Sequence, residues 1–158
     1  MAIIDQFRIP TDLTIEFIGT FARFEYALKR SGYAHGSESQ VNPDWDRLGR
    51  ELATLDEAAL SPVIECCPYL RSHPPMKQVL ESGLLAWKPR AAMTSEIETI
   101  LMSVRTVRNN VFHGGKFPDG PVAEPLRDEN LIRDCLALLE SLLALPGLPA
   151  EVLRHFQS

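Results

Sequence analysis

Apolar residues at helical spacing mark three long segments of this chain. In the first, residues 11–30, large apolar side chains recur at steps of four, four, three and four, at Leu13, Phe17, Phe21, Phe24 and Leu28. This spacing places them on one face of a helix. We expect Thr11 or Asp12, after Pro10, to cap the start of this helix and Ser31-Gly32 to end it.

Two further stripes predict long helices in the second half of the chain. One begins near residue 91, with Thr94 or Ser95 as the expected cap, and runs to Gly114-Gly115. Its apolar positions are Ile97, Ile100, Leu101, Val104, Val107 and Val111. A loop rich in proline is expected over 118–125. The last long helix is expected to open at Asp128 or Glu129 and to end at 146–149, with another turn or two over 151–156. Its broad apolar face comprises Leu131, Ile132, Cys135, Leu136, Leu138, Leu139, Leu142 and Leu143.

The region between these helices is less regular. Residues 33–40 are expected to form a loop, and Asn42-Pro43-Asp44 to start a helix that runs to about Leu55, with Pro43 in its first turn. Five prolines divide residues 57–90, where we expect short helices at 58–67 and 76–81, joined by turns. No segment with strict two-residue alternation stands out, and no internal repeat is present.

These patterns predict an all-α fold, an up-and-down helical bundle of four main helices with short extra helices, in a single helical domain over 1–158. The first helix is unusually rich in phenylalanine. Such a surface can exceed what one bundle buries, and this points to a partner subunit.

Composition narrows the class of protein. The 158 residues are 45% apolar and 23% charged, as in ordinary globular domains. Sixteen basic and 21 acidic residues give a net charge of −5, which excludes a constitutive nucleic-acid coat. The three cysteines lack Cys-x-x-Cys spacing and are expected to be reduced, in or near a core. The N-terminus lacks a signal-peptide pattern and no apolar run is long enough to span a bilayer, so a cytoplasmic location is expected.

One segment, residues 104–116, carries candidate chemistry. Arg105, Arg108, Asn109, Phe112 and His113 follow the three- and four-residue spacing of a single helix face. A histidine can exchange protons near neutral pH, and an arginine offers a planar, permanently charged group to phosphate. An asparagine can orient the imidazole or a ligand. Without a metal, this set suits attack of a ribose 2′-OH on the adjacent phosphate, with His113 as general base or acid.

A plainer interpretation stands beside this one. A histidine in the last turn of a helix is favoured by the helix dipole, a Gly-Gly pair is an ordinary helix stop, and the arginines can belong to a solvated face. Glu25, in the first predicted helix, can meet Arg105 or Arg108 from the neighbouring helix, or it can be a solvated flank residue.

The run Arg108-Asn109-Asn110-Val111-Phe112-His113 resembles the Arg-x4–6-His signature of the HEPN superfamily (higher eukaryotes and prokaryotes nucleotide-binding domains). A polar residue directly after the arginine is also typical of that signature. The continuation Phe-His-Gly-Gly-Lys, near the end of a long helix in a small helical chain, resembles the stand-alone bacterial members.

This resemblance implies a helical domain that forms a homodimer with the two motifs facing each other across the twofold axis. Many members are metal-independent endoribonucleases that act as toxins or in phage defence, and others bind nucleotides or proteins without catalysis. Carried over by position, Arg108 and His113 are catalytic and Asn109 supports them. From helical geometry we add Arg105 and Lys116 as phosphate contacts.

No other motif competes with this segment. The remaining histidines lack metal-ligand spacing, and neither a glycine-rich phosphate loop nor a Gly-x-Ser-x-Gly elbow is present, so no metal or cofactor is expected. The leading hypothesis is an endoribonuclease that leaves a 2′,3′-cyclic phosphate, with RNA as substrate and an antitoxin or nucleotidyltransferase-type companion protein as a candidate partner. The alternative is a non-catalytic module that binds a nucleotide, RNA or a protein. A third hypothesis is a helical regulatory protein whose basic stripe is a docking surface.

Overall fold

The computed structural model describes residues 2, 7–113, 124 and 126–158. Within these residues the chain forms seven α-helices and two separate two-stranded antiparallel sheets. The elements in order are α1 (Thr11–Arg30), β1 (Ala34–Ser37), β2 (Gln40–Pro43), α2 (Trp45–Leu52), α3 (Glu57–Glu65), α4 (Pro68–Ser72), β3 (Lys77–Glu81), β4 (Leu84–Lys88), α5 (Glu96–Phe112), α6 (Arg127–Leu143) and α7 (Ala150–Gln157). The prediction of an all-α bundle is therefore wrong, because two β-hairpins are part of the fold.

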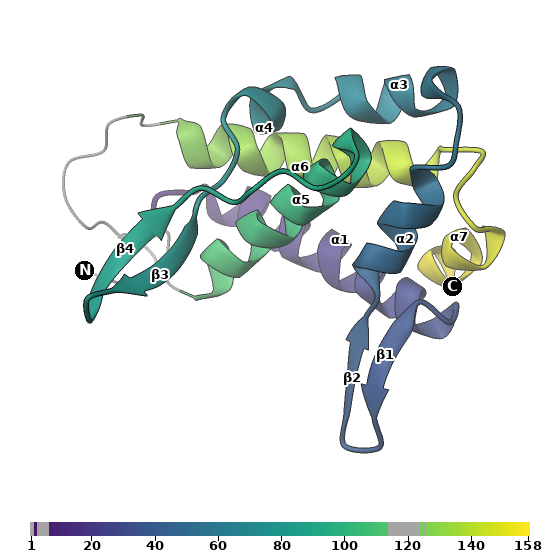
Figure 1. The fold of residues 1–158 in the computed structure, drawn as a ribbon, viewed down its shortest axis with the longest axis horizontal. Coiled ribbons are helices and arrows are strands. Elements are labelled where there is room, and N and C mark those ends of the chain that lie inside the picture. The colour runs from purple at the N-terminus through teal and green to yellow at the C-terminus, as the bar shows by residue number, and fades with distance from the viewer. Residues whose placement is uncertain (1, 3–6, 114–123, 125) are drawn as a thin grey trace.

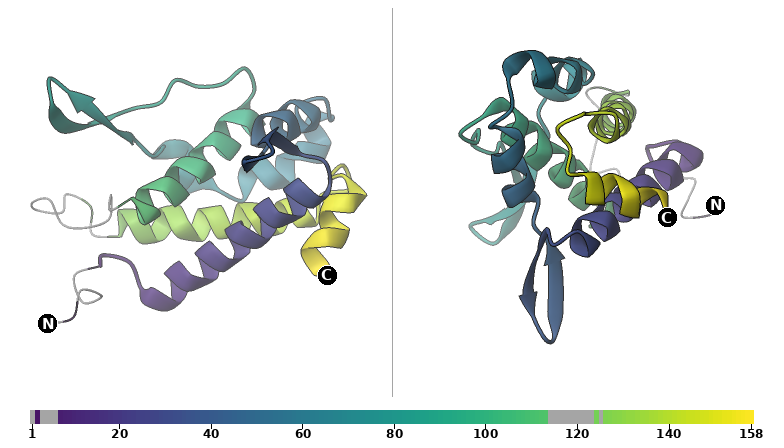
Figure 2. Two further views of the ribbon diagram at one scale, coloured as in Figure 1. Left: turned by 90° about the horizontal axis from the view of Figure 1, so that it is seen from below. Right: turned by 90° about the vertical axis from the view of Figure 1, so that its right-hand side faces the viewer.

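Both hairpins project from the helical body, as Figure 1 shows. The predicted loop at 33–40 contains β1 and leads into β2, and Gly36 lies in β1. A Cβ atom at Gly36 would lie 2.0 Å from the carbonyl oxygen of Gln40, so only glycine lets the strands approach this closely. The β1–β2 hairpin extends away from the helices in two perpendicular views (Figure 2).

The second hairpin replaces the short helix predicted at 76–81. Its two-residue turn is Ser82-Gly83, and both residues have positive φ, 52° and 79°. A turn of this kind matches the twist of paired strands and directs the chain back along itself. Local pairing with residues 84–88 therefore overrides the helical tendency of the 76–81 segment.

The three long helices predicted from apolar spacing are confirmed, with small shifts at their ends. Ser95, one of the two expected cap residues, caps α5 in a reciprocal capping box with Glu98. The start of α1 is Thr11, but the residue before it is Pro10 and no side chain caps the helix. Pro43 lies in β2 instead of the first turn of α2, where Asp44 is the cap and accepts a hydrogen bond from the Arg47 amide. The glycine pair 114–115 and the loop predicted at 118–125 lie largely outside the described residues.

The core is built around the phenylalanines of α1. Phe17, Phe21 and Phe24 are at most 2% exposed, and α1 packs against α6 and α7. Trp45 of α2 stacks on Phe21 and Phe24, with ring centroids 5.4 and 5.2 Å apart, and Phe156 of α7 meets Phe24 edge-on at 6.2 Å. The expectation that this aromatic stripe serves a partner subunit is therefore wrong, because the chain buries it in its own core.

The burial of the phenylalanines predicts that substitutions at buried and exposed positions of α1 change the free energy of unfolding by very different amounts. Phe24→Ala removes a fully buried ring from two aromatic contacts and should lower the free energy of unfolding by about 3–5 kcal/mol. Tyr26→Ala, two residues away but with a side chain 49% exposed, should change it by about 0.5 kcal/mol. Urea denaturation followed by circular dichroism measures both. Equal losses in the two variants would contradict the assignment of the stripe to the core.

Candidate functional site

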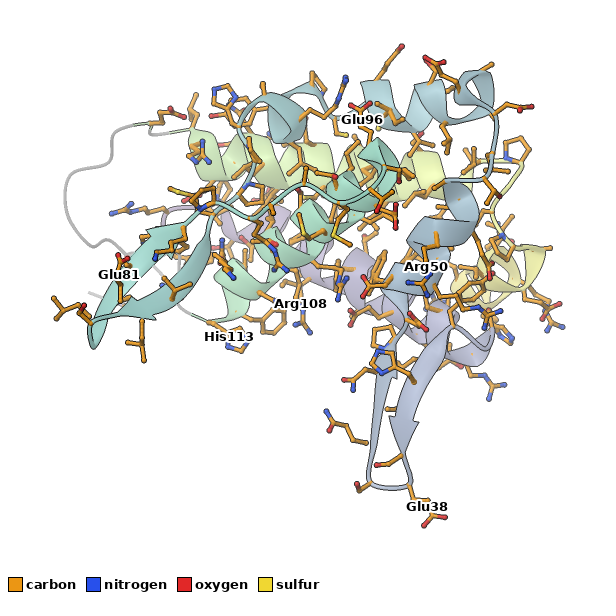
Figure 3. The ribbon with its side chains drawn as sticks, viewed as in Figure 1. Glu38, Arg50, Glu81, Glu96, Arg108 and His113 are labelled. Atoms are coloured by element: carbon orange, nitrogen blue, oxygen red, sulfur yellow. The ribbon has the colours of Figure 1, made fainter. Side chains whose placement is uncertain are left out.

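The rotation of α5 about its axis is set by its buried side chains. Ile97, Leu101, Val104 and Val107 are at most 2% exposed and belong to the core. Because these residues face the helical body, the polar residues that follow Arg105 at helical spacing lie beside the buried face. They occupy the C-terminal half of the helix. Figure 3 shows Arg108 and His113 at this end of α5.

Arg108 is held by several neighbours at once. Its Nη1 donates to Oδ1 of Asn109 at 2.9 Å, and its guanidinium carbon lies 5.5 Å from the ring centre of Phe21 and 4.8 Å from that of Phe112. Both distances are within the range of cation–π attraction. Its Nε is buried and has no hydrogen-bond acceptor among the described residues. The aromatic rings therefore help to position the guanidinium, while the side chain remains 32% exposed.

A carboxylate from α1 faces this arginine. Oε2 of Glu25 lies 4.0 Å from Nη2 of Arg108, and Oε1 of Glu25 accepts a hydrogen bond of 3.0 Å from the indole N–H of Trp45. The interpretation that Glu25 meets one of the two arginines is thus confirmed, and Arg108 is the one. The predicted site residues did not include Glu25. In the sequence, the feature that points to Glu25 is its position four residues after Phe21, which places both residues on the same face of the helix.

His113 ends the helix. Its backbone N–H donates to the carbonyl of Asn109 at 2.9 Å, so it is the C-cap of α5, and its side chain is exposed. Within the described part of the chain no hydrogen bond or ion pair of the imidazole is found, so the ring can face a ligand. Asn109 directs its amide oxygen to Arg108, so its role in this structure is to orient the arginine and not the histidine.

Of the two residues predicted as phosphate contacts, Arg105 and Lys116, the structure describes only Arg105. Nη1 of Arg105 is 2.7 Å from Oδ1 of Asp46 at the start of α2, and both side chains are partly exposed. This ion pair directs Arg105 toward α2 and offsets its charge. Lys116 lies outside the described residues.

A cavity of about 200 Å³ lies beside the N-terminal half of α5, away from Arg108 and His113. It is lined in part by Arg71, Arg90, Glu96, Thr99 and Ser103. The ion pair between Arg71 and Glu96, 2.7 Å apart, lies at this cavity. Among the described residues, none of the predicted site residues lines this cavity.

The described residues offer no group of three or more His, Cys, Asp or Glu side chains arranged to hold a metal ion. The three cysteines are free thiols, and Cys67 and Cys135 are buried, as expected. In the same part of the chain, no helix combines the length and the apolar character that crossing a membrane requires.

Comparisons with protein-family models, with curated proteins and with solved structures found no match to this chain. The interpretation of the site therefore rests on its own residues: an arginine fixed by two rings and a carboxylate, next to an exposed histidine on the same helix end.

The Arg105–Asp46 ion pair generates a prediction about polyanion binding. Asp46→Asn removes the partner charge and frees the Arg105 guanidinium, so affinity for single-stranded RNA should rise. The slope of log K against log salt should steepen by about 0.7, which corresponds to one more phosphate contact. Fluorescence anisotropy over a range of salt concentrations measures this. The control, Asp56→Asn, removes the same charge from the residue before α3, and an equal gain there would indicate a net-charge effect only.

Proposed function

We propose that this protein is a metal-independent endoribonuclease of the HEPN type. The observation that carries the proposal is the arrangement at the end of α5. The Arg108 guanidinium lies over the rings of Phe21 and Phe112 and beside Glu25, and the exposed imidazole of His113 follows five residues later. A positioned cation and an exposed imidazole at one helix end are the two kinds of group that RNA cleavage at the 2′-OH requires.

In the proposed reaction, His113 removes the proton from a ribose 2′-OH. The 2′ oxygen then bonds to the adjacent phosphorus, and the bond from phosphorus to the 5′ oxygen breaks. The products are a 2′,3′-cyclic phosphate and a 5′-hydroxyl, whose oxygen takes up a proton from water. Arg108 stabilises the negative charge that develops on the phosphoryl oxygens. Asn109 and Glu25 hold Arg108 in position.

The proposal includes a homodimer with two such sites near a twofold axis, and a cytoplasmic setting in which the enzyme acts as a toxin or in phage defence. An antitoxin or a nucleotidyltransferase-type companion protein is the proposed partner. The net charge of −5 supports a requirement for such a companion, because the chain as a whole repels RNA.

A second candidate function is a non-catalytic HEPN-like module that binds a nucleotide, RNA or a protein. The observation that favours it is the pairing of both arginines with carboxylates, Arg105 with Asp46 and Arg108 with Glu25. These pairs weaken the attraction of the site for phosphate. Catalysis and binding make opposite predictions for conservative changes at Arg108.

The first test concerns the proton acceptor. His113→Ala should lower the rate of RNA cleavage by about 10²–10⁴-fold, since this is the usual contribution of general acid–base catalysis. The melting temperature should stay nearly unchanged, because the side chain is exposed. Gel assays on labelled RNA measure the rate, and EDTA should have no effect. His35→Ala changes another exposed histidine, in β1, and serves as the control. Undiminished cleavage in His113→Ala would refute the endoribonuclease proposal.

The second test separates catalysis from binding. Arg108→Lys keeps the positive charge but loses the planar group that lies over the two rings. In an endoribonuclease, kcat should fall steeply while the Kd for RNA changes little. In a binding module there is no turnover to lose, and Arg108→Ala should weaken RNA binding more than Arg108→Lys does. If neither variant affects cleavage or binding, the stripe is a solvated helix face.

A further inference from the structure

The cavity beside the N-terminal half of α5 lies where the β3–β4 hairpin joins the helical body. Its volume is about 200 Å³. The segments just before β3 and just after β4 both line it, together with residues of α4 and α5. Figure 3 labels Glu96, one of the lining residues, at the start of α5, whereas Arg108 and His113 lie toward the other end of this helix. Among the described residues, the cavity therefore shares no lining residue with the candidate site.

Most of the residues that line the cavity are apolar. Leu70 of α4 and Ile100 of α5 are at most 3% exposed, and three of the other lining residues are prolines, Pro74, Pro75 and Pro89. Proline has a fixed φ and no backbone N–H. The prolines therefore offer a ligand apolar contacts but no hydrogen-bond donor. A polar group on the ligand has to be recognised by side chains.

Three charged residues line the cavity: Arg71 in α4, Arg90 after β4 and Glu96 in α5. Arg71 and Glu96 neutralise each other, because Nε and Nη2 of Arg71 lie 2.8 and 2.7 Å from the same carboxylate oxygen, Oε1 of Glu96. In the part of the chain that the structure describes, no carboxylate forms an ion pair with Arg90. The wall of the cavity therefore carries one uncompensated positive charge.

Arg90 is tethered to α5 by a single long hydrogen bond. Its Nη1 donates to Oγ1 of Thr106 over 3.4 Å. A guanidinium has five N–H donors, and this bond uses one of them. The other donors suit a carboxylate, which can accept two parallel N–H bonds from one arginine. Beside an apolar wall such a pair is stronger than in bulk water, because the effective dielectric constant is lower.

The volume limits the size of the apolar part of a ligand. An apolar cavity of about 150 Å³ holds one benzene ring. A cavity of about 200 Å³ thus has room for one such ring and one small polar substituent. A nucleotide, with its base, sugar and phosphate, needs more space, since sites for drug-sized ligands begin at roughly 300 Å³.

We propose that this cavity binds a small organic carboxylate whose apolar body is about the size of a benzene ring. The apolar body lies against the prolines and the apolar side chains of α4 and α5, and the carboxylate accepts hydrogen bonds from Arg90. The single negative charge of the ligand balances the uncompensated charge of the wall. The inference goes beyond the proposed function, and its test involves no RNA.

Benzoate is the probe for the test, titrated into the full chain and followed by the amide resonances of isotope-labelled protein. The Kd should be on the order of 1 mM or lower, the range of fragment-sized ligands. The amides of Thr99, Ile100 and Ser103 should shift, because these residues line the cavity, whereas that of Asn109 should not. Benzamide has the same ring but no charge, and acetate has the charge but no ring. Each should bind about 10-fold more weakly or worse.

Three variants separate Arg90 from the other charges. Arg90→Gln should raise the Kd for benzoate about 10-fold or more, since it removes a charged hydrogen-bond donor. Arg50→Gln removes the same charge from an exposed position in α2 that does not line the cavity, and it should leave the Kd unchanged. Arg71→Gln combined with Glu96→Gln removes the ion pair but keeps Arg90. Because the two charges of this pair cancel, the Kd should stay within about threefold of the wild-type value.

Several results would overturn the proposal. Absence of benzoate binding at about 10 mM would mean that the cavity holds only water, for which it has ample room. Benzamide or inorganic phosphate binding as tightly as benzoate would show that the site does not recognise a carboxylate on an apolar body. Unchanged affinity in Arg90→Gln, or an equal loss in Arg50→Gln, would remove Arg90 as the partner of the carboxylate. Shifts confined to the C-terminal end of α5 would place the ligand at the candidate site instead.

Discussion

The stacking of Trp45 on α1 is the interaction on which both the core and the candidate site depend. Its indole ring covers Phe21 and Phe24 and thereby joins α2 to α1. Its N–H bonds to Glu25, which in turn faces Arg108. A polar group on a buried ring needs such a partner, because an unsatisfied N–H in the interior is destabilising. The same aromatic residue that packs the core therefore positions a carboxylate against the arginine of the site.

The helix α5 connects the other parts of the molecule, because its three sides have different partners. Its apolar side enters the core and fixes its rotation. A second side carries Thr99, Thr106 and Asn110. Their side chains form hydrogen bonds with Met93, Arg90 and Met76, respectively, and so anchor both ends of the segment that contains the β3–β4 hairpin. The remaining side presents the candidate site. One helix therefore carries the core contacts, the anchors of the hairpin segment and the candidate site.

Ion pairs between helices orient the two arginines predicted for the candidate site. Arg105 and Arg108 each face a carboxylate from a different element, Asp46 at the start of α2 and Glu25 in α1. Partly exposed pairs of this kind add little stability, because water screens them. Their main effect is on geometry: they hold long side chains in one direction. Arg108 keeps its exposed part available for a ligand, whereas Arg105 is directed toward α2.

The amino-acid sequence alone determined the long helices, because apolar residues at helical spacing must be buried on one side whatever the rest of the chain does. It also located the candidate site on a single helix, where Arg108 and His113 are related by local geometry. The hairpins escaped prediction because pairing at 77–88 depends on the Ser82-Gly83 turn and on residues that do not alternate strictly between polar and apolar. The burial of Phe17, Phe21 and Phe24 required knowledge of where Trp45 and Phe156 lie, and these are distant in the sequence. Only the tertiary structure decided which arginine Glu25 meets and that Asp46 engages the other, since such choices depend on how separate helices pack.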